Sequence, residues 1–280
     1  MARIVGAVTT SHIPAIGNAI SAERQDEPYW SRFFQGYDKV VAWLNRIEPD
    51  VAVMVFNDHG LNFFLDNLPT FAVGAAAEYR SEDEGWGLPT FPPYRGAPEL
   101  SWHVIESLVE DEFDIATCQE MLVDHAFINP MRLLWPNQNP PSIATVPVAV
   151  NTVQHPLPKP SRCFRFGVSL GAAIESYDED LRVVVIGTGG MSHQLDGERA
   201  GFINKEFDML CMDKLVDDPE ALTRYSIDDI VRLAGTQGVE IINWIVARAT
   251  LSGRVEKIHS SYHIPISNTA AGVLALEHTR

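Results

Sequence analysis

Cysteine is scarce in this 280-residue chain, and its three copies, Cys118, Cys163 and Cys211, lie far apart. No CxxC pair occurs, so the sequence suggests neither a disulfide framework nor a thiolate zinc site. The first residues contain no apolar stretch long enough for a signal peptide. Together these absences fit a reducing compartment, and we expect a cytoplasmic protein.

Basic residues are also few. The chain has 21 Lys and Arg against 37 Asp and Glu, a formal net charge of −16 at pH 7. A nucleic-acid partner needs a basic face, and no cluster of Lys and Arg is present. No run approaches the roughly 18 apolar residues of a membrane span. We therefore expect neither a nucleic-acid nor a membrane partner.

Short apolar runs rich in β-branched residues alternate with segments of helical period. The runs expected to form buried strands are Ile4–Val8, Val51–Phe56, Thr145–Val150 and Leu181–Ile186. The segments expected to form helices are Tyr29–Ile47, Leu100–Val109, Phe207–Leu215 and Val239–Ala249. This alternation predicts an α/β fold with a central, mainly parallel or mixed sheet flanked by helices. Because no stretch resembles a domain linker, we expect a single layered domain over residues 1–280.

Histidines follow three of the predicted strands. His12 comes after the first strand, His59 after the second and His193 after the last. One histidine after a strand is more often a loop or capping residue than a ligand. The chain holds only nine histidines, however, and ligands of open α/β sheets bind beyond the carboxyl ends of the strands. Three histidines at one such edge therefore indicate a shared site.

A site of this kind has two metal chemistries open to it. One is a zinc centre of the His₃ or His₂Glu kind, which suits hydrolysis. The other is a facial triad of two histidines and one carboxylate, which leaves positions open on Fe(II). Glu240, at the start of a strongly apolar helix, is a candidate carboxylate. It fits equally well as a first-turn glutamate that complements the helix dipole.

Other polar residues could complete a site. His125 is a further histidine, and it follows Val123-Asp124 in a segment of mixed apolar and polar residues. Ser267 and Asn268 offer hydrogen-bonding groups that can fix a substrate carboxylate. They also fit a turn, or an N-cap for the segment Ala270–Leu276.

Long motifs in the chain resemble the class III extradiol dioxygenases, and in particular the catalytic β subunit of protocatechuate 4,5-dioxygenase. The likeness extends from end to end. The segments that carry it are Ser11–Pro14, Asn57–His59, Asp83–Gly87, Val123–His125, Gly187–Leu195, Gly201–Asp208, Gly238–Glu240, His263–Pro265 and Ser267–Thr269.

The resemblance implies an iron-dependent enzyme that opens aromatic rings in the breakdown of lignin-derived compounds. It implies that His12, His59 and Glu240 are the Fe(II) ligands, that His193 is an acid/base residue, and that His125 is a second active-site histidine near the substrate. The family fold, an α/β core with helices around it, agrees with the pattern derived above.

The resemblance also implies that Ser267 and Asn268 hold a substrate carboxylate. Protocatechuate, gallate and 3-O-methylgallate are the expected substrate types. The loop Leu88–Gly96 and the segment Ala126–Arg132 depart from the protocatechuate enzymes, so the choice among these rings stays open. We expect a homo-oligomer, with or without an added small α-type subunit.

Two other functions use the same residues. A zinc hydrolase would hold its metal with the same histidines and carboxylate. A non-catalytic binding protein on this scaffold is expected to lack one or more ligands, and here every candidate ligand is present.

Overall fold

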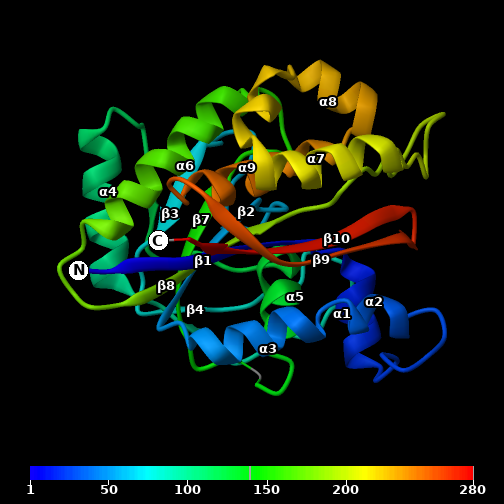
Figure 1. Ribbon diagram of the computed structural model, residues 1–280, viewed down its shortest axis with the longest axis horizontal. Helices are drawn as coiled ribbons and strands as arrows, with labels where there is room; N and C mark the ends of the chain where they lie inside the picture. Colours follow the sequence, from blue (N-terminus) through cyan, green and yellow to red (C-terminus); the bar gives the residue numbers. More distant parts are fainter. Residues whose placement is uncertain (139, 280) are drawn as a thin grey trace.

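The computed structural model describes residues 1–138 and 140–279, and an eight-stranded sheet forms its centre (Figure 1). The strands lie in the order β6-β3-β7-β2-β8-β1-β10-β9. Their bounds are β1 Arg3–Thr10, β2 Val51–Phe56, β3 Phe71–Gly74, β6 Ala116–Cys118, β7 Ala144–Val150, β8 Arg182–Thr188, β9 Val255–Ile266 and β10 Thr269–His278. A separate ribbon pairs β4, Glu78–Tyr79, with β5, Tyr94–Arg95.

The four central strands, β7, β2, β8 and β1, are parallel to one another. Parallel neighbours need long crossover connections, and at least one helix separates each of these strands from the next. Toward the two sides, β10 pairs antiparallel with β1, and β3 pairs antiparallel with β7. The predicted α/β fold with a mixed sheet is confirmed, and the four predicted strands form its centre.

Helices cover both faces of this sheet (Figure 1). One layer contains α4 Pro98–Glu110, α6 Pro160–Glu175, α7 Lys205–Asp217, α8 Ile227–Ala234 and α9 Ile241–Ala249. The other contains α1 Pro14–Ser21, α2 Ser31–Gln35, α3 Asp38–Ile47 and α5 His125–Leu134. Two 3-10 turns, η1 Pro219–Arg224 and η2 Gly238–Glu240, precede α8 and α9 respectively. None of the helices in the part of the chain that the structure describes has the length and hydropathy of a membrane span.

Each central strand contributes to two cores, because successive side chains of a strand point to opposite faces. From β2, Val53 and Val55 enter the core beneath α4, α6 and α9. Met54 and Phe56 enter the core beneath α1, α3 and α5. Burial on both sides explains why these strands appear in the sequence as continuous apolar runs.

The segment expected as one helix over Tyr29–Ile47 forms two helices, α2 and α3. The interruption lies at Gly36 and has a physical cause in the sheet. His259 of β9 binds the Gly36 carbonyl oxygen at 2.9 Å. A Cβ atom on Gly36 would lie 2.5 Å from the Ser261 hydroxyl. Contacts with β9 therefore replace the helical hydrogen bonds that the apolar period predicts.

The segment Ala270–Leu276 is part of strand β10 and does not form the helix for which Ser267 and Asn268 were considered as caps. Its alanines are buried between the two helix layers, with β1 on one side and β9 on the other. Strand pairing and burial on both faces override the helical preference of alanine here. The alternative interpretation of Ser267 and Asn268, a turn, is the one that the structure contains.

Candidate metal centre

Three neighbouring parallel strands bring their histidines to one edge of the sheet. In the sheet order, β8 lies between β2 and β1, and all three run in the same direction. His12 follows the end of β1, His59 follows β2 and His193 follows β8. The shared direction places the three strand ends together, which is the arrangement that the sequence pattern predicts.

Glu240 lies among these histidines. It ends the 3-10 turn η2, just before α9, and is only 5% exposed. Its Oε2 lies 3.3 Å from His12 Nε2 and 3.9 Å from His193 Nε2. Its Oε1 lies 3.7 Å from His59 Nε2. The carboxylate thus sits where the three strand-end histidines meet and does not simply cap a helix.

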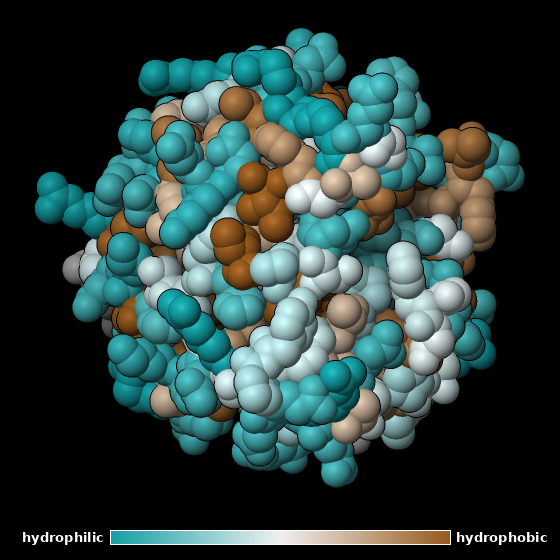
Figure 2. Space-filling model, turned by 90° about the vertical axis from the view of Figure 1, so that its right-hand side faces the viewer, coloured by the Kyte–Doolittle hydropathy of each residue, from teal (hydrophilic) through white to brown (hydrophobic). Residues whose placement is uncertain are grey.

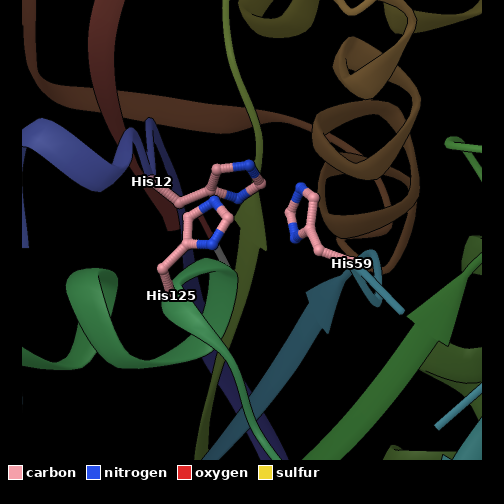
Figure 3. A group of neighbouring side chains, drawn as sticks. All are labelled: His12, His59 and His125. Atoms are coloured by element: carbon pink, nitrogen blue, oxygen red, sulfur yellow. The ribbon is translucent and has the colours of Figure 1, made fainter. Parts of the chain in front are cut away.

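His125 completes the cluster from the opposite side. It is the first residue of α5, and its ring centroid lies 4.2 Å from that of His59 and 5.2 Å from that of His12. Figure 3 shows the three imidazoles gathered around a common centre. One ring nitrogen of each lies within 4.8 Å of the others, a spacing that a single metal ion can span. His125 can therefore be the third donor beside His12 and His59, and the short contacts of Glu240 with the same two rings make it the alternative. Glu84 and Asp124 form a second close group with His59 and His125.

The outward nitrogens of these rings have their own partners. His12 Nδ1 lies 3.1 Å from the Thr188 hydroxyl, and His59 Nδ1–H donates to the Asp124 carboxylate at 3.0 Å. His125 Nδ1 contacts the carboxylate of Glu84. Such partners fix the orientation of each ring and turn its Nε2 inward, as in known metal sites.

Asp124 connects two parts of the site. It is fully buried and N-caps α5 by accepting a hydrogen bond from the Ala126 amide at 2.8 Å. Its other oxygen accepts hydrogen bonds from both the backbone amide and the ring of His59. The same carboxylate therefore positions His59 and the helix that begins with His125.

Burial opposes the charged form of both Glu240 and His59, yet neighbouring opposite charges prevail at both residues. Burial would raise the pKa of the Glu240 carboxyl, but His12, His59 and His193 hold that pKa well below its ordinary value. Burial also lowers the His59 pKa, but Asp124 and Glu240 outweigh it and raise that pKa to about 10. The site is therefore organised to hold positive charge between its carboxylates.

His125 behaves differently. Burial, followed by the positive charge of His59, lowers the pKa of His125 to about 4, although Glu84 acts in the opposite direction. His125 is consequently neutral at pH 7. With its Nδ1 proton directed to the Glu84 carboxylate, its Nε2 can accept a hydrogen bond or bind a metal.

Sequence reasoning assigned no role to several residues that support the cluster. Asn57 donates to Glu240 Oε1 at 3.3 Å, and Asn243 donates to Asn57 at 3.0 Å. Asp124, Thr188 and Glu84 are the other supporting residues. Asn57 and Asp124 lie beside predicted site histidines in the sequence, which was an available signal. A polar Asn243 within the apolar helix Val239–Ala249 was another.

Ser267 and Asn268 form the turn between β9 and β10. Thr269, the next residue, pairs with His193 in an antiparallel bridge, so the turn lies beside the His193 loop. The Ser267 backbone has a φ of 57° and its amide donates to the Tyr29 hydroxyl at 2.9 Å. The structure thus brings the turn next to the cluster.

A cavity of about 170 Å³ opens beside His59. Apolar side chains that include Phe63, Leu68 and Val150 line it. The side chain of His59 is 20% exposed, whereas those of His12 and Glu240 are 4% and 7% exposed. The cluster is therefore most accessible on the side of His59, next to an apolar recess that suits an aromatic ring.

Comparison with known proteins places these residues in a family. The family described as "Catalytic LigB subunit of aromatic ring-opening dioxygenase" matches residues 6–273. A gallate dioxygenase of Pseudomonas putida is 43% identical over 195 residues, which cover 70% of this chain and 57% of that protein. A 2,3-dihydroxyphenylpropionate/2,3-dihydroxicinnamic acid 1,2-dioxygenase of Rhodococcus globerulus is 27% identical, covering 84% of this chain and 87% of that protein.

A solved structure has the same fold. An uncharacterized protein from Escherichia coli K12 aligns with a TM-score of 0.61 over 97% of this chain and 99% of that chain. The two sequences are only 14% identical, so the likeness concerns the fold alone.

Replacing Asp124 with alanine tests its contacts with His59 and with the first turn of α5. We expect Asp124→Ala to lower the free energy of unfolding by about 2–3 kcal/mol, because a helix cap is lost and buried donors lose their acceptor. Urea denaturation in the presence of a chelator measures this without any contribution from metal. Asp66→Ala, which alters an exposed residue of the β2–β3 loop, is the control. Equal stability losses in the two variants would contradict the proposed contact.

Proposed function

This chain belongs to the aromatic ring-opening dioxygenase family, and we propose that it cleaves catecholic benzoates with Fe(II) held by His12, His59 and Glu240. The family predicted from the sequence is confirmed. Membership in it sets aside the zinc hydrolase and the non-catalytic binding protein as alternatives. The proposed substrates are rings of the gallate, protocatechuate or 3-O-methylgallate type, and the reaction is extradiol cleavage.

The arrangement of donor atoms around Glu240 carries the proposal. Two ligands bound at right angles to one metal, each at about 2.1 Å, lie roughly 3 Å apart. Glu240 approaches this spacing with one oxygen to each ring: Oε2 lies 3.3 Å from His12 Nε2, and Oε1 lies 3.7 Å from His59 Nε2. Two imidazoles and one carboxylate form the facial set that leaves positions open on non-haem iron.

Glu240 is favoured over His125 as the third ligand because of charge. A buried carboxylate needs a compensating cation, whereas neutral His125 needs none. The Gly190 amide and Asn57 already orient the two oxygens of Glu240, at 2.7 and 3.3 Å. His125 is then left free to contact the substrate.

When bound, Fe(II) supplies Lewis acidity and open positions for two ring oxygens and O₂. The residues around it supply proton transfer and orientation. His193 Nδ1 lies 2.9 Å from the Met191 carbonyl oxygen, which can only accept, so Nδ1 carries the proton. His193 Nε2 therefore has a free lone pair, directed toward the cluster, to accept the proton of a ring hydroxyl and return it later.

Two further groups orient the ring. The neutral His125 accepts a hydrogen bond from the substrate at Nε2. Ser267 and Asn268, on the turn beside His193, bind the benzoate carboxylate and so determine which ring bond faces the reacting oxygens. Both atoms of O₂ enter the ring-opened acid, so the reaction needs no external reductant.

We also propose that the chain acts within an assembly. Several loops at the site edge expose large apolar side chains: Phe64, Leu65, Trp86, Val153 and Leu195. Figure 2 shows apolar patches among the polar side chains of the face that lies on the right in Figure 1. A surface of this kind favours cover by another polypeptide, either a second copy of the chain or a small α-type subunit.

Oxygen uptake tests the proposed reaction. The protein is purified anaerobically, loaded with Fe(II) and given protocatechuate, gallate or 3-O-methylgallate, with and without a small α-type subunit. We expect consumption of one O₂ per ring and a yellow ring-opened product with at least one of these substrates. No uptake with any of the three, in either arrangement, would overturn the proposal.

The metal ligands are tested by iron content. We expect His12→Ala and Glu240→Gln to lose bound Fe(II), because each removes one of three protein ligands. His278→Ala is the matched control, since His278 ends β10 at the opposite edge of the sheet. Iron near one atom per chain in either ligand variant would show that the ligand set is wrong.

The role of His193 is tested by kinetics. Loss of a positioned acid/base residue lowers kcat by about 10²–10⁴-fold. We expect His193→Ala to lose activity in this range while retaining Fe(II) and anaerobic substrate binding. An unchanged kcat would exclude His193 from proton transfer, and loss of iron would instead identify it as a ligand.

A further inference from the structure

Asp208 is a buried carboxylate that the proposed reaction does not use. It lies in α7 and is only 2% exposed. Its Oδ1 accepts a hydrogen bond from the Ser192 amide at 2.8 Å. Its Oδ2 accepts from the hydroxyls of Ser192 and Tyr262, both at 2.7 Å. In the part of the chain that the structure describes, Asp208 forms no ion pair with a lysine or arginine.

A carboxylate is an unusual side chain at a buried position whose hydrogen-bond donors are all neutral. Burying a charge among neutral donors is costly, and simple packing would be better served by an apolar or amide side chain. An ionised carboxylate is the side chain that accepts at both oxygens without donating. Asp208 can therefore bind two hydroxyls and one amide that come from two separate segments.

The first of these segments is the loop that carries His193. Ser192 immediately precedes this histidine, and its hydroxyl also accepts a hydrogen bond from the Asn204 amide at 2.8 Å. The Ser192 carbonyl oxygen accepts from the Ala270 amide at 3.1 Å. Asp208 therefore holds both the backbone and the side chain of the residue next to the proposed proton acceptor.

The second segment is strand β9. Tyr262 pairs with Gly272 of β10, and the strand continues to Ile266, after which Ser267 and Asn268 form the turn. The contact between Tyr262 and Asp208 ties this strand to α7. One carboxylate thus connects the His193 loop to the strand that leads to the proposed carboxylate-binding turn.

We propose that Asp208 is a positioning residue. Through its hydrogen bonds to Ser192 and Tyr262, it fixes the proton acceptor His193 and the substrate-binding turn Ser267–Asn268 relative to each other. The inference rests on the proposed function. Asp208 then has two separate effects. Its hydrogen bonds to Ser192 affect the chemical step, and its hydrogen bond to Tyr262 affects binding of the substrate carboxylate.

Substitutions can separate the contact with Ser192 from the contact with Tyr262. Tyr262→Phe removes only the hydroxyl that reaches Asp208 from β9, and Ser192→Ala removes only the hydroxyl beside His193. Asp208→Ala removes both connections, whereas Asp208→Asn retains part of the hydrogen bonding. Asp213→Asn changes an exposed aspartate of the same helix and is the matched control.

Steady-state kinetics with two substrates test the division. With the best carboxylated ring, we expect Tyr262→Phe to raise KM by about tenfold at nearly constant kcat. Catechol, which lacks the carboxylate, should not respond to this substitution. Ser192→Ala should lower kcat on both substrates, Asp208→Ala should combine the two effects, and Asp208→Asn should recover part of the loss.

Hydrogen exchange supplies a readout that does not depend on turnover. In the metal-free protein, we expect faster exchange over residues 262–268 in Tyr262→Phe, and over both 189–195 and 262–268 in Asp208→Ala. Asp213→Asn should match the wild type. Melting temperatures measured in parallel separate a local change from general destabilisation.

The outcomes distinguish this inference from the proposed function. If the wild type turns over but all variants lose kcat equally on both substrates, or none differs from Asp213→Asn, the positioning role is wrong and the proposed function stands. A wild type without turnover on any ring overturns the proposed function and this inference together.

Discussion

The buried carboxylate of Glu240 is the group around which the site is organised. A carboxylate that is only 5% exposed cannot stay ionised without nearby positive charge or strong hydrogen-bond donors. Here it has both, since imidazoles of the strand-end histidines surround it and the Gly190 amide donates to it at 2.7 Å. The three-residue turn η2 brings it to this place before α9 enters the core. The proposed cation, bound by Glu240, His12 and His59, would add to this compensation.

The parallel centre of the sheet provides the frame. Three adjacent strands with the same direction end at one edge, so short loops suffice to bring His12, His59 and His193 together. Helix α5 closes the cluster from the other side, and Asp124 joins its first turn to His59. In the same way, Asp208 joins α7 to the loop of His193 and to β9. Buried carboxylates thus connect elements that are far apart in the sequence.

The sequence predicted the strands and their histidines because both depend on local patterns. Continuous apolar runs indicate strands buried on both faces, and a histidine directly after such a run lies at the carboxyl end of that strand. Glu240 could not be decided in this way, since a first-turn glutamate looks the same whether it complements a dipole or binds a metal. The metal-ligand interpretation of Glu240 depends on the family resemblance and remains a prediction. His125, Ser267 and Asn268 likewise depended on the resemblance, and their roles remain predictions, as do the single domain and the iron.

Other features required the folded chain. Nothing in the local sequence relates Asp208 to Tyr262, or Asn57 to Glu240, because these contacts span 54 and 183 residues. The break between α2 and α3 arises from contacts of Gly36 with β9, which no helical period reveals. The alanine-rich end of the chain forms a strand because it is paired on both sides, and only the topology determines that.

The most direct test of the central claim is a crystal structure of the anaerobic, Fe(II)-loaded protein. We predict one iron bound at about 2.1 Å by His12 Nε2, His59 Nε2 and a carboxylate oxygen of Glu240, with His125 and His193 beyond bonding distance. Iron bound by His12, His59 and His125, with Glu240 outside the coordination sphere, would contradict it.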